Sequence, residues 1–255
     1  DFKGPIIHPQ FWPEDLDYSD KNVVIIGSGA TAITLVHAMA GKAKHVTMLQ
    51  RSPTYIASMP NKSLVPNFAT KNLPVKIQYD LNRAAHIGFS VFQYNLCKSQ
   101  PELMKAYFKN EARKNLPKGY DIDKHFTPKY NPWDERVCAV PDGDLFDVLS
   151  NGKASIITDH IEKFTEDGIL LKSGQKLKAD IIITATGLEL QMIGGIEPYI
   201  DGKKYNAEEG MIYKGMMIKD LPNFGFILGY TNASWTLKAD LVAAYFCRLI
   251  NETEK

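Results

Sequence analysis

NVVIIGSGATAITLVHAMAGKAKHVTMLQRSP, residues 22–53, carries the strongest indication of the fold. Residues 22–26 form an apolar run rich in β-branched side chains and end at Gly27, which is typical of a strand buried on both faces of a parallel sheet. Residues 31–40 are rich in Ala, Leu, Ile and Met, which predicts a helix, and residues 45–49 form a second apolar strand. The stretch therefore predicts the strand–helix–strand unit that opens an α/β domain.

The turn between the first strand and the helix, GSGATA, fits a dinucleotide-binding site. Gly27 permits the tight turn, Gly29 lets the backbone approach a pyrophosphate, and Ala32 keeps the helix close to the strand. The pyrophosphate would then lie at the helix N-terminus. A GxGxxA motif alone is weak evidence, because glycine turns join many strands to helices, but the strands on both sides support it. The predicted cofactor contacts in the turn are Gly27, Ser28, Gly29, Ala30, Thr31 and Ala32.

The end of the second strand indicates which dinucleotide is bound. An NAD site usually has Asp or Glu here to hold the ribose 2′-hydroxyl, whereas this strand is followed by Arg51 and Ser52. A guanidinium can bind a 2′-phosphate through two parallel charge-assisted hydrogen bonds, and the serine hydroxyl can add a third. We therefore predict NADPH. The alternative is that Arg51 is a solvated loop arginine.

The composition excludes several classes of protein. With 255 residues, of which 44% are hydrophobic and 23% charged, the chain can bury one large core or two smaller ones. A net charge of +1 argues against a nucleic-acid surface, and no apolar run reaches the roughly 18 residues that a membrane span needs. Cys97, Cys138 and Cys247 lie far apart and form no CxxC pair, so neither a disulfide framework nor a dithiol redox centre is predicted. No metal site is predicted, and a reducing cytoplasm is the expected location.

The segment before the first strand carries a second motif. Residues 2–12, FKGPIIHPQFW, match the pattern FxGxxxHxxxW through Phe2, Gly4, His8 and Trp12. This pattern is the fingerprint of Baeyer-Villiger monooxygenases and their flavin-containing relatives, which the chain resembles. In that family the motif lies at the join between the cofactor domains, and the resemblance implies that it couples their movement. Proton transfer by His8 is the alternative.

Residues 60–118 have a different texture, with apolar side chains at mixed helical spacings and an excess of Lys and Arg over Asp and Glu. We expect two or three helices inserted into the nucleotide domain. A solvated helical face explains the basic residues, and weak, membrane-associated contact with anionic lipid is the alternative. In the family that the chain resembles, the corresponding insertion helps to cover the substrate site.

Residues 121–143 contain Pro128, Pro132 and Pro141, which predict a long ordered loop before a short helix at 144–149. Arg136 lies within this loop. Three segments sharpen the resemblance to the ethionamide-activating type of Baeyer-Villiger monooxygenase: HPQFWPEDLDY at 8–18, NPWDERVCAVPDGDLF at 131–146 and GYTNASWTLKADL at 229–241.

The resemblance implies a catalytic role for Arg136, which matches the family's active-site arginine. Such enzymes reduce FAD with NADPH, form a flavin C4a-peroxide with O2, and let it attack a carbonyl or a sulfur. A guanidinium does not give up its proton, so it can stabilise the peroxide anion without quenching it. The alternative is that Arg136 pairs with Asp134 or Glu135 to hold the loop.

From residue 155 onward the sequence predicts a small antiparallel meander, with turns at 166–168 and 173–174, and then a buried strand at 179–184. That strand ends in Ala-Thr-Gly, which resembles the sequence that closes the nucleotide domain in two-dinucleotide flavoproteins, and Thr186 and Gly187 join the predicted cofactor contacts. Further strands are expected at 211–218 and 225–228, and a helix capped by Ser234 at 234–250.

The sequence predicts an α/β fold, and the resemblance implies that it is of the two-dinucleotide-binding-domain flavoprotein type. Residues 1–20 are expected to be an inter-domain linker, 21–187 a Rossmann-like NADPH domain with the helical insertion, and 188–255 an incomplete part of the FAD domain. No second glycine fingerprint occurs in the sequence, so we expect a fragment whose FAD pyrophosphate site lies upstream of Asp1. Sheet edges left without their neighbours would favour dimerisation or self-association.

The expected function is that of a portion of an FAD- and NADPH-dependent monooxygenase. It would insert one atom of O2 into a ketone, or onto a sulfur or nitrogen centre. Two alternatives remain, an isolated NADP(H)-binding module and a single-cofactor NADPH dehydrogenase. The dehydrogenase is the weaker one, because it needs an acid or base beside the nicotinamide and we predict no residue for that role.

Overall fold

The computed structural model describes residues 2–59, 71–230 and 235–255. The chain divides into two compact units, residues 1–187 and 188–255, and each is described by itself. None of the helices in the described ranges is long and apolar enough to cross a membrane.

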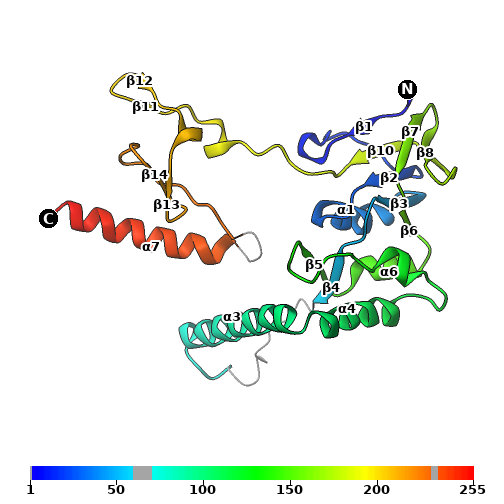
Figure 1. The fold of residues 1–255 in the computed structure, drawn as a ribbon, viewed down its shortest axis with the longest axis horizontal. Helices are drawn as coiled ribbons and strands as arrows, with labels where there is room; N and C mark the ends of the chain where they lie inside the picture. Colours follow the sequence, from blue (N-terminus) through cyan, green and yellow to red (C-terminus); the bar gives the residue numbers. More distant parts are fainter. Residues whose placement is uncertain (1, 60–70, 231–234) are drawn as a thin grey trace. The chain divides into compact units, whose positions relative to one another are not determined.

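A five-stranded parallel sheet forms the centre of the first unit (Figure 1). Its strand order is β1-β10-β2-β3-β6, so the first strand of the strand–helix–strand unit, β2, is also the central strand. The strands are β1 (Ile6–Ile7), β2 (Asn22–Ile26), β3 (His45–Gln50), β6 (Ala154–Thr158) and β10 (Ile181–Thr184). Helix α1 (Ala30–Ala40) connects β2 to β3, which confirms the predicted unit.

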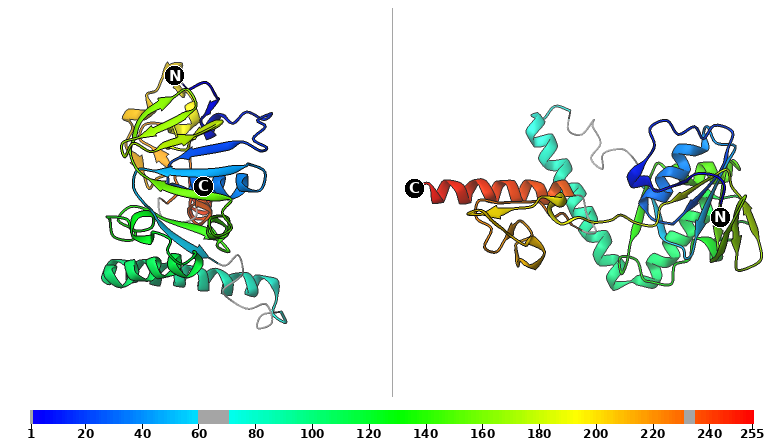
Figure 2. Two further views of the ribbon diagram at one scale, coloured as in Figure 1. Left: turned by 90° about the vertical axis from the view of Figure 1, so that its right-hand side faces the viewer. Right: turned by 90° about the horizontal axis from the view of Figure 1, so that it is seen from above.

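The apolar runs of β2 and β10 are buried on both faces of this sheet. Val23 and Ile25 pack in one core cluster with the apolar side of α1, whereas Val24 packs in a second cluster with Ile182 and Leu171. Successive side chains of a strand point to opposite faces, so a strand that is apolar at every position must be covered on both. One cover is helical and the other is the three-stranded meander, as Figure 2 shows.

The meander consists of β7 (Ile161–Thr165), β8 (Gly168–Leu171) and β9 (Lys176–Lys178), with turns at the predicted positions. One part of that prediction was wrong. Residues 154–158 do not begin the meander, because β6 pairs in parallel with β3 and forms an edge of the main sheet. The meander therefore begins only after Asp159 and His160, which follow a strand of the nucleotide-type sheet.

The insertion contains two long helices, α3 (Val75–Ser99) and α4 (Pro101–Asn115), as predicted. Residues 60–70 of the predicted insertion lie outside the described residues. Helix α4 contacts β4 (Tyr55–Met59) and buries Met104 and Phe108 in a cluster with Tyr55 and Cys97. Helix α3 buries only Cys97 among its residues and exposes most of its apolar side chains.

The predicted loop at 121–143 is interrupted by two elements. Helix α5 (Ile122–His125) forms behind an Asp121 cap, and β5 (Val137–Pro141) pairs in parallel with β4. The prolines predicted a loop without regular structure. Pro141 is the last residue of β5, however, so its missing N–H costs no hydrogen bond in the interior of the strand pair. Helix α6 (Asp144–Ser150) follows as expected.

The second unit agrees less well with the sequence. The strand expected at 211–218 is a hairpin of two short strands, β13 (Ile212–Tyr213) and β14 (Met217–Ile218), and residues 225–228 form no strand. A further hairpin joins β11 (Tyr199–Ile200) to β12 (Lys203–Lys204). Helix α7 (Trp235–Thr253) matches the predicted helix, and its Ser234 cap lies outside the described residues.

Candidate functional site

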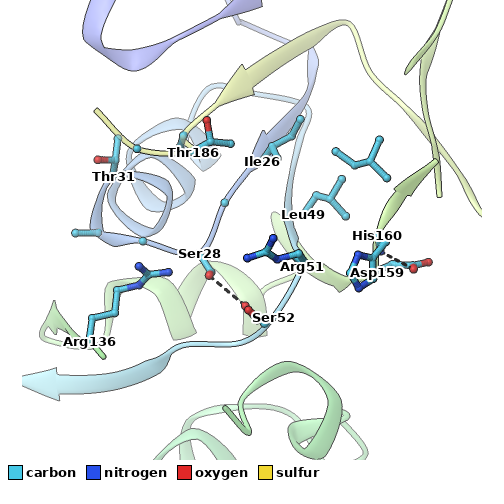
Figure 3. A pocket seen from close by; sticks show the side chains of 16 residues that line it. Ile26, Ser28, Thr31, Leu49, Arg51, Ser52, Arg136, Asp159, His160 and Thr186 are labelled. Carbon is cyan, nitrogen blue, oxygen red and sulfur yellow. Dashed lines mark hydrogen bonds between the residues drawn. The ribbon is translucent and has the colours of Figure 1, made fainter. Parts of the chain in front are cut away.

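A pocket of about 620 Å³ lies at the carboxyl ends of four strands of the main sheet (Figure 3). Its walls come from the segments that follow β2, β3, β6 and β10, together with Arg136 before β5. Ligands of open parallel sheets bind at this edge, beside the strand where the order reverses. The lining residues are Ile26, Gly27, Ser28, Gly29, Ala30, Thr31, Leu49, Arg51, Ser52, Arg136, Asp159, His160, Ile161, Ala185, Thr186 and Gly187.

The two motif glycines are required for different reasons. Gly27 has φ of +137°, and a Cβ there would lie 2.3 Å from the carbonyl oxygen of Ala185 in the neighbouring strand end. Gly29 has an ordinary φ of −83°, and a Cβ there would meet nothing within 4 Å. The fold therefore requires Gly27, whereas Gly29 keeps open the space in which a ligand would approach the backbone.

The amino end of α1 opens into the pocket. Gly29 is its N-cap and supplies no side-chain cap, so the first N–H groups of the helix are available to an anion. Ala32 is fully buried against the sheet, as its predicted packing role requires, and it does not line the pocket. The Ser28 hydroxyl donates a hydrogen bond to the Ser52 carbonyl oxygen (3.2 Å), which fastens the glycine turn to the end of β3.

Arg51 follows a strand end that is held by a buried amide. Gln50 is 1% exposed and donates from Nε2 to the carbonyl oxygen of His125 (2.9 Å) and to the Thr158 hydroxyl (2.8 Å). The Arg51 side chain itself is exposed and makes no hydrogen bond or ion pair with any residue that the structure describes. The backbone before Arg51 is fixed, and the guanidinium is available for a ligand.

Arg136 reaches the same pocket from the other side. Figure 3 shows the Arg136 and Arg51 side chains directed toward one another across Ser28. The Arg136 carbonyl oxygen accepts a hydrogen bond from the Tyr130 hydroxyl (3.0 Å), but its exposed guanidinium bonds to no residue in the described part of the chain.

The alternative interpretation, an ion pair of Arg136 with a neighbouring acid, is not what the structure contains. Asp134 pairs instead with Lys98 of α3, at 2.6 Å between Oδ1 and Nζ. Two guanidinium groups without acidic partners thus face a glycine turn and an uncapped helix end. This arrangement suits a ligand with several negative charges, such as a dinucleotide that carries an extra phosphate.

The residues of the N-terminal motif all have contacts within the first unit. Phe2 packs against the meander cluster and Trp12 against the helical cluster, while a Cβ at Gly4 would lie 2.5 Å from the Asp180 carbonyl oxygen. His8 donates from Nε2 to the Gly187 carbonyl oxygen (2.9 Å) and accepts the Gln10 N–H at Nδ1 (3.3 Å). His8 thereby attaches the motif to the last residue of this unit.

Sequence reasoning missed Asp159, His160 and Ile161. Asp159 accepts hydrogen bonds from the backbone N–H groups of His160 (2.6 Å) and Ser173 (3.3 Å), and hydrogen bonding to Ser173 lowers the pKa of its carboxyl. Its charge therefore holds the start of the meander. The sequence did contain a signal for these residues, namely the predicted strand that ends at residue 158. Assigning that strand to the parallel sheet would have placed the residues after it at the pocket.

Comparisons with known proteins identify relatives of this chain. The chain is 56% identical over 255 residues to a probable FAD-binding monooxygenase, AlmA, of Acinetobacter baylyi, and 54% identical over 252 residues to the FAD-containing monooxygenase EthA of Mycobacterium tuberculosis. This chain is a homologue of the FAD-containing monooxygenases. It spans about half the length of these relatives, 51% of AlmA and 52% of EthA. No family model matches the chain.

Solved structures support the same fold. A cyclohexanone monooxygenase variant from Rhodococcus bound to NADP⁺ superposes with a TM-score of 0.73 at 18% identity, and the match covers all of this chain and 57% of that one. An open cyclohexanone monooxygenase gives a TM-score of 0.68 at 19% identity, covering 96% of this chain and 57% of that one. At this identity the likeness concerns the fold, which is that of two-dinucleotide-binding-domain monooxygenases.

Proposed function

We propose that this chain supplies the NADPH-binding half of an FAD- and NADPH-dependent monooxygenase that inserts one atom of O2 into an organic substrate. The observation that carries the proposal is the pocket, where Arg51 and Arg136 flank a glycine turn without acidic partners. The homology to FAD-containing monooxygenases supports it over a single-cofactor dehydrogenase or an isolated nucleotide-binding module.

Both phosphate-bearing parts of NADPH have a matching group in the pocket. The pyrophosphate would accept hydrogen bonds from the first N–H groups of α1, at Ala30 and Thr31, in the space that Gly29 leaves open. The 2′-phosphate would be bound by Arg51 and Ser52. Thr186 and Gly187 line the opposite wall, at the end of β10.

Arg136 would stabilise negative charge during oxygen transfer. FAD, when bound, accepts the hydride of NADPH and activates O2, and we expect it to be held largely by parts of the longer protein outside this chain. The Arg136 guanidinium remains protonated and is free of acids, so it can stabilise charge that develops on oxygen at the reacting centre. The substrate class that we propose is a ketone or a sulfur- or nitrogen-containing compound.

The N-terminal motif would couple the two units. His8 bonds to Gly187, after which the chain leaves the first unit, and Gly187 has φ of +129°. A change at this position would therefore be transmitted to the segment that leads to residue 188. Phe2, Gly4 and Trp12 support His8 by packing the motif on the sheet.

The helical insertion exposes a surface that could bind a partner. Helix α3 exposes apolar side chains on several sides, which supports contact with another surface. Self-association and weak binding to anionic lipid both stay predictions. Sedimentation of the chain with and without anionic vesicles would test them together.

Oxygen incorporation tests the proposed function. The longer protein that contains this chain, supplied with NADPH, a ketone or sulfide, and ¹⁸O2, should place one labelled atom in the product. Its visible spectrum should show bound flavin, whereas this chain alone should not. Oxidation of NADPH that is coupled to substrate turnover without flavin or labelled oxygen would support the dehydrogenase instead.

A further inference from the structure

The loop that carries Arg136 is attached to helix α3 by Lys98. The Lys98 ammonium pairs with Asp134 at 2.6 Å and donates to the Trp133 carbonyl oxygen at 3.3 Å. Lys98 is the second-last residue of α3, where a positive charge is favourable beside the helix carboxyl end. Hydrogen bonding to Lys98 lowers the pKa of Asp134, and the same bond raises the pKa of Lys98, so both groups are charged near neutral pH.

Trp133 holds the same loop against α3 by packing. Its φ is 66°, a left-handed conformation that costs a bulky residue roughly 1–3 kcal/mol and persists only where the surroundings impose it. Its ring lies 6.4 Å from that of Tyr94, and its buried indole N–H has no oxygen or nitrogen partner in the described ranges. The Cys97 thiol, a weak acceptor, is the group beside it.

Tyr130 fixes the other end of the loop. Its hydroxyl donates its single proton to the Arg136 carbonyl oxygen (3.0 Å), so the bond of 2.8 Å to Thr54 must be donated by the threonine. Tyr55 donates to the Tyr130 carbonyl oxygen (2.8 Å), and burial raises the pKa of Tyr55 to about 12, which keeps it a donor. The backbone on both sides of Arg136 is therefore held, while its guanidinium is not.

Asp134 is the acid near Arg136 that Lys98 binds in an ion pair. It lies two residues from Arg136 and is 44% exposed, so a free carboxylate there could reach a guanidinium on the same short loop. Such a pair would draw Arg136 away from the pocket and offset its positive charge. The Lys98 pair prevents this while it anchors the loop.

We propose that Lys98 is a positioning residue for Arg136, because it binds Asp134 and so keeps the Arg136 guanidinium directed into the nucleotide pocket. The inference rests on the proposed function of Arg136 and extends it to the helical insertion. Helix α3, which does not line the pocket, would then control the charge at the reacting centre through one ion pair.

A double-mutant cycle in the flavin-loaded longer protein tests the proposal. Lys98→Met keeps the aliphatic stem and frees Asp134, so the rate of oxygenated product formation should fall about fivefold, the scale of a half-exposed ion pair, with the KM for NADPH unchanged. Lys98→Met combined with Asp134→Asn should recover most of that rate, because the competing acid is gone. Lys98→Arg should retain it. Asp134→Asn alone completes the cycle and should keep most of the rate for the same reason, and Glu135 is present in every variant.

Lys105→Met is the matched control, since Lys105 also pairs with an acid, Glu102, at 2.7 Å but within α4. It should leave the rate unchanged. The proposal is overturned if Lys98→Met has no effect, if the double variant is as slow as Lys98→Met, or if Lys98→Met slows an Arg136→Ala protein further by the same factor.

Hydrogen exchange separates this proposal from the function it rests on. Amides at 131–137 should exchange faster in Lys98→Met and not in Lys105→Met, whatever the activity, and unchanged exchange would overturn the anchoring role of Lys98. If exchange rises but Arg136→Ala oxygenates normally, the proposed function of Arg136 fails and the attachment of the loop by Lys98 stands.

Discussion

Arg51 and Arg136 face the same pocket, but the backbone around them is held in different ways. Arg51 follows β3 directly, and the strand end before it is fixed by buried hydrogen bonds of Gln50 to Thr158 and His125. Arg136 precedes β5, and its loop is fixed by contacts with a helix about 35 residues earlier in the chain, through Lys98 and Trp133.

The positions of Arg51 and Arg136 are therefore fixed by different parts of the chain. We call the pocket wall with the glycine turn and Arg51 the strand side, and the wall with Arg136 the loop side. The strand side is built from elements that any strand–helix–strand unit contains, so its geometry follows from local sequence. The loop side depends on the insertion, and its key residue, Trp133, occupies a conformation that its own propensity disfavours. We therefore expect the strand side to determine cofactor binding and the loop side to determine chemistry.

Removal of the Arg136 guanidinium should have the largest effect. In the proposed longer protein that holds both cofactors, the flavin of the Arg136→Ala variant should still accept hydride from NADPH, because we propose that the glycine turn and Arg51 bind the nucleotide. Oxygenated product per NADPH should fall by about 10²–10³, the usual cost of losing one preorganised group that stabilises developing charge. Anaerobic flavin bleaching, followed by product analysis after O2 is added, measures the two steps separately.

Arg136→Lys is the companion variant, and it should rescue poorly. An ammonium has a different reach, and it can lose its proton to a basic oxygen centre. Near-normal product from Arg136→Ala would show that Arg136 is structural and would remove the distinction between the two sides of the pocket.

The two motif glycines give a second test on the strand side. Gly27→Ala should destabilise the chain by about 3 kcal/mol, because its φ is positive and the new methyl group meets the Ala185 carbonyl oxygen. Gly29→Ala should fold normally but bind NADPH at least about tenfold more weakly, since the methyl group occupies ligand space. Urea unfolding and nucleotide titration of both variants measure this, and equal stability losses would contradict it.

Loss of the Arg51 side chain should cost less. Arg51→Ala should weaken NADPH binding by about 1.5–3 kcal/mol, or roughly ten- to a hundredfold, and leave NADH binding nearly unchanged. Titration with both nucleotides gives the ratio. If Arg51→Ala keeps the wild-type preference, the 2′-phosphate is bound elsewhere.

The sequence predicted the strand side well because its signals are local. The apolar run of β2, the glycine turn and the arginine after β3 lie within about 30 consecutive residues, so each supports the interpretation of the others. The exception is β6. Its alternation looks the same in a meander and at the edge of a parallel sheet, and only the long-range pairing with β3 decides between them.

On the loop side, the sequence pointed to Arg136, which does line the pocket, but not to the structure around it. Arg136 was found through its motif, whereas β5 was hidden by the prolines around it and by pairing with β4, about 80 residues away in sequence. Lys98 gave no signal, because a lysine near a helix end is ordinary. Its role becomes visible only once the fold brings it to Asp134.

His125 connects the strand side to α5 and allows a finer test. The Thr158 hydroxyl accepts a hydrogen bond from Gln50 and forms a second one with His125 Nδ1 (2.8 Å). Burial, with a smaller effect of the Lys124 charge, lowers the pKa of His125 below its ordinary value of 6.5. The unfolded chain thus binds a proton at a pH where the folded chain does not.

Stability should accordingly rise with pH in that window, since the unfolded state holds more protons there. The contribution of His125 is fully present above pH 6.5 and is lost as pH falls from 6.5 toward the lowered folded-state pKa. His125→Gln, whose amide can still hydrogen-bond to the Thr158 hydroxyl, should flatten this part of the curve of unfolding free energy against pH. His86→Gln, at an exposed position on α3, should leave it unchanged. Urea unfolding between pH 5 and 8 compares the three proteins, and an identical slope in wild type and His125→Gln would mean that α5 does not hold the end of β3 through a neutral histidine.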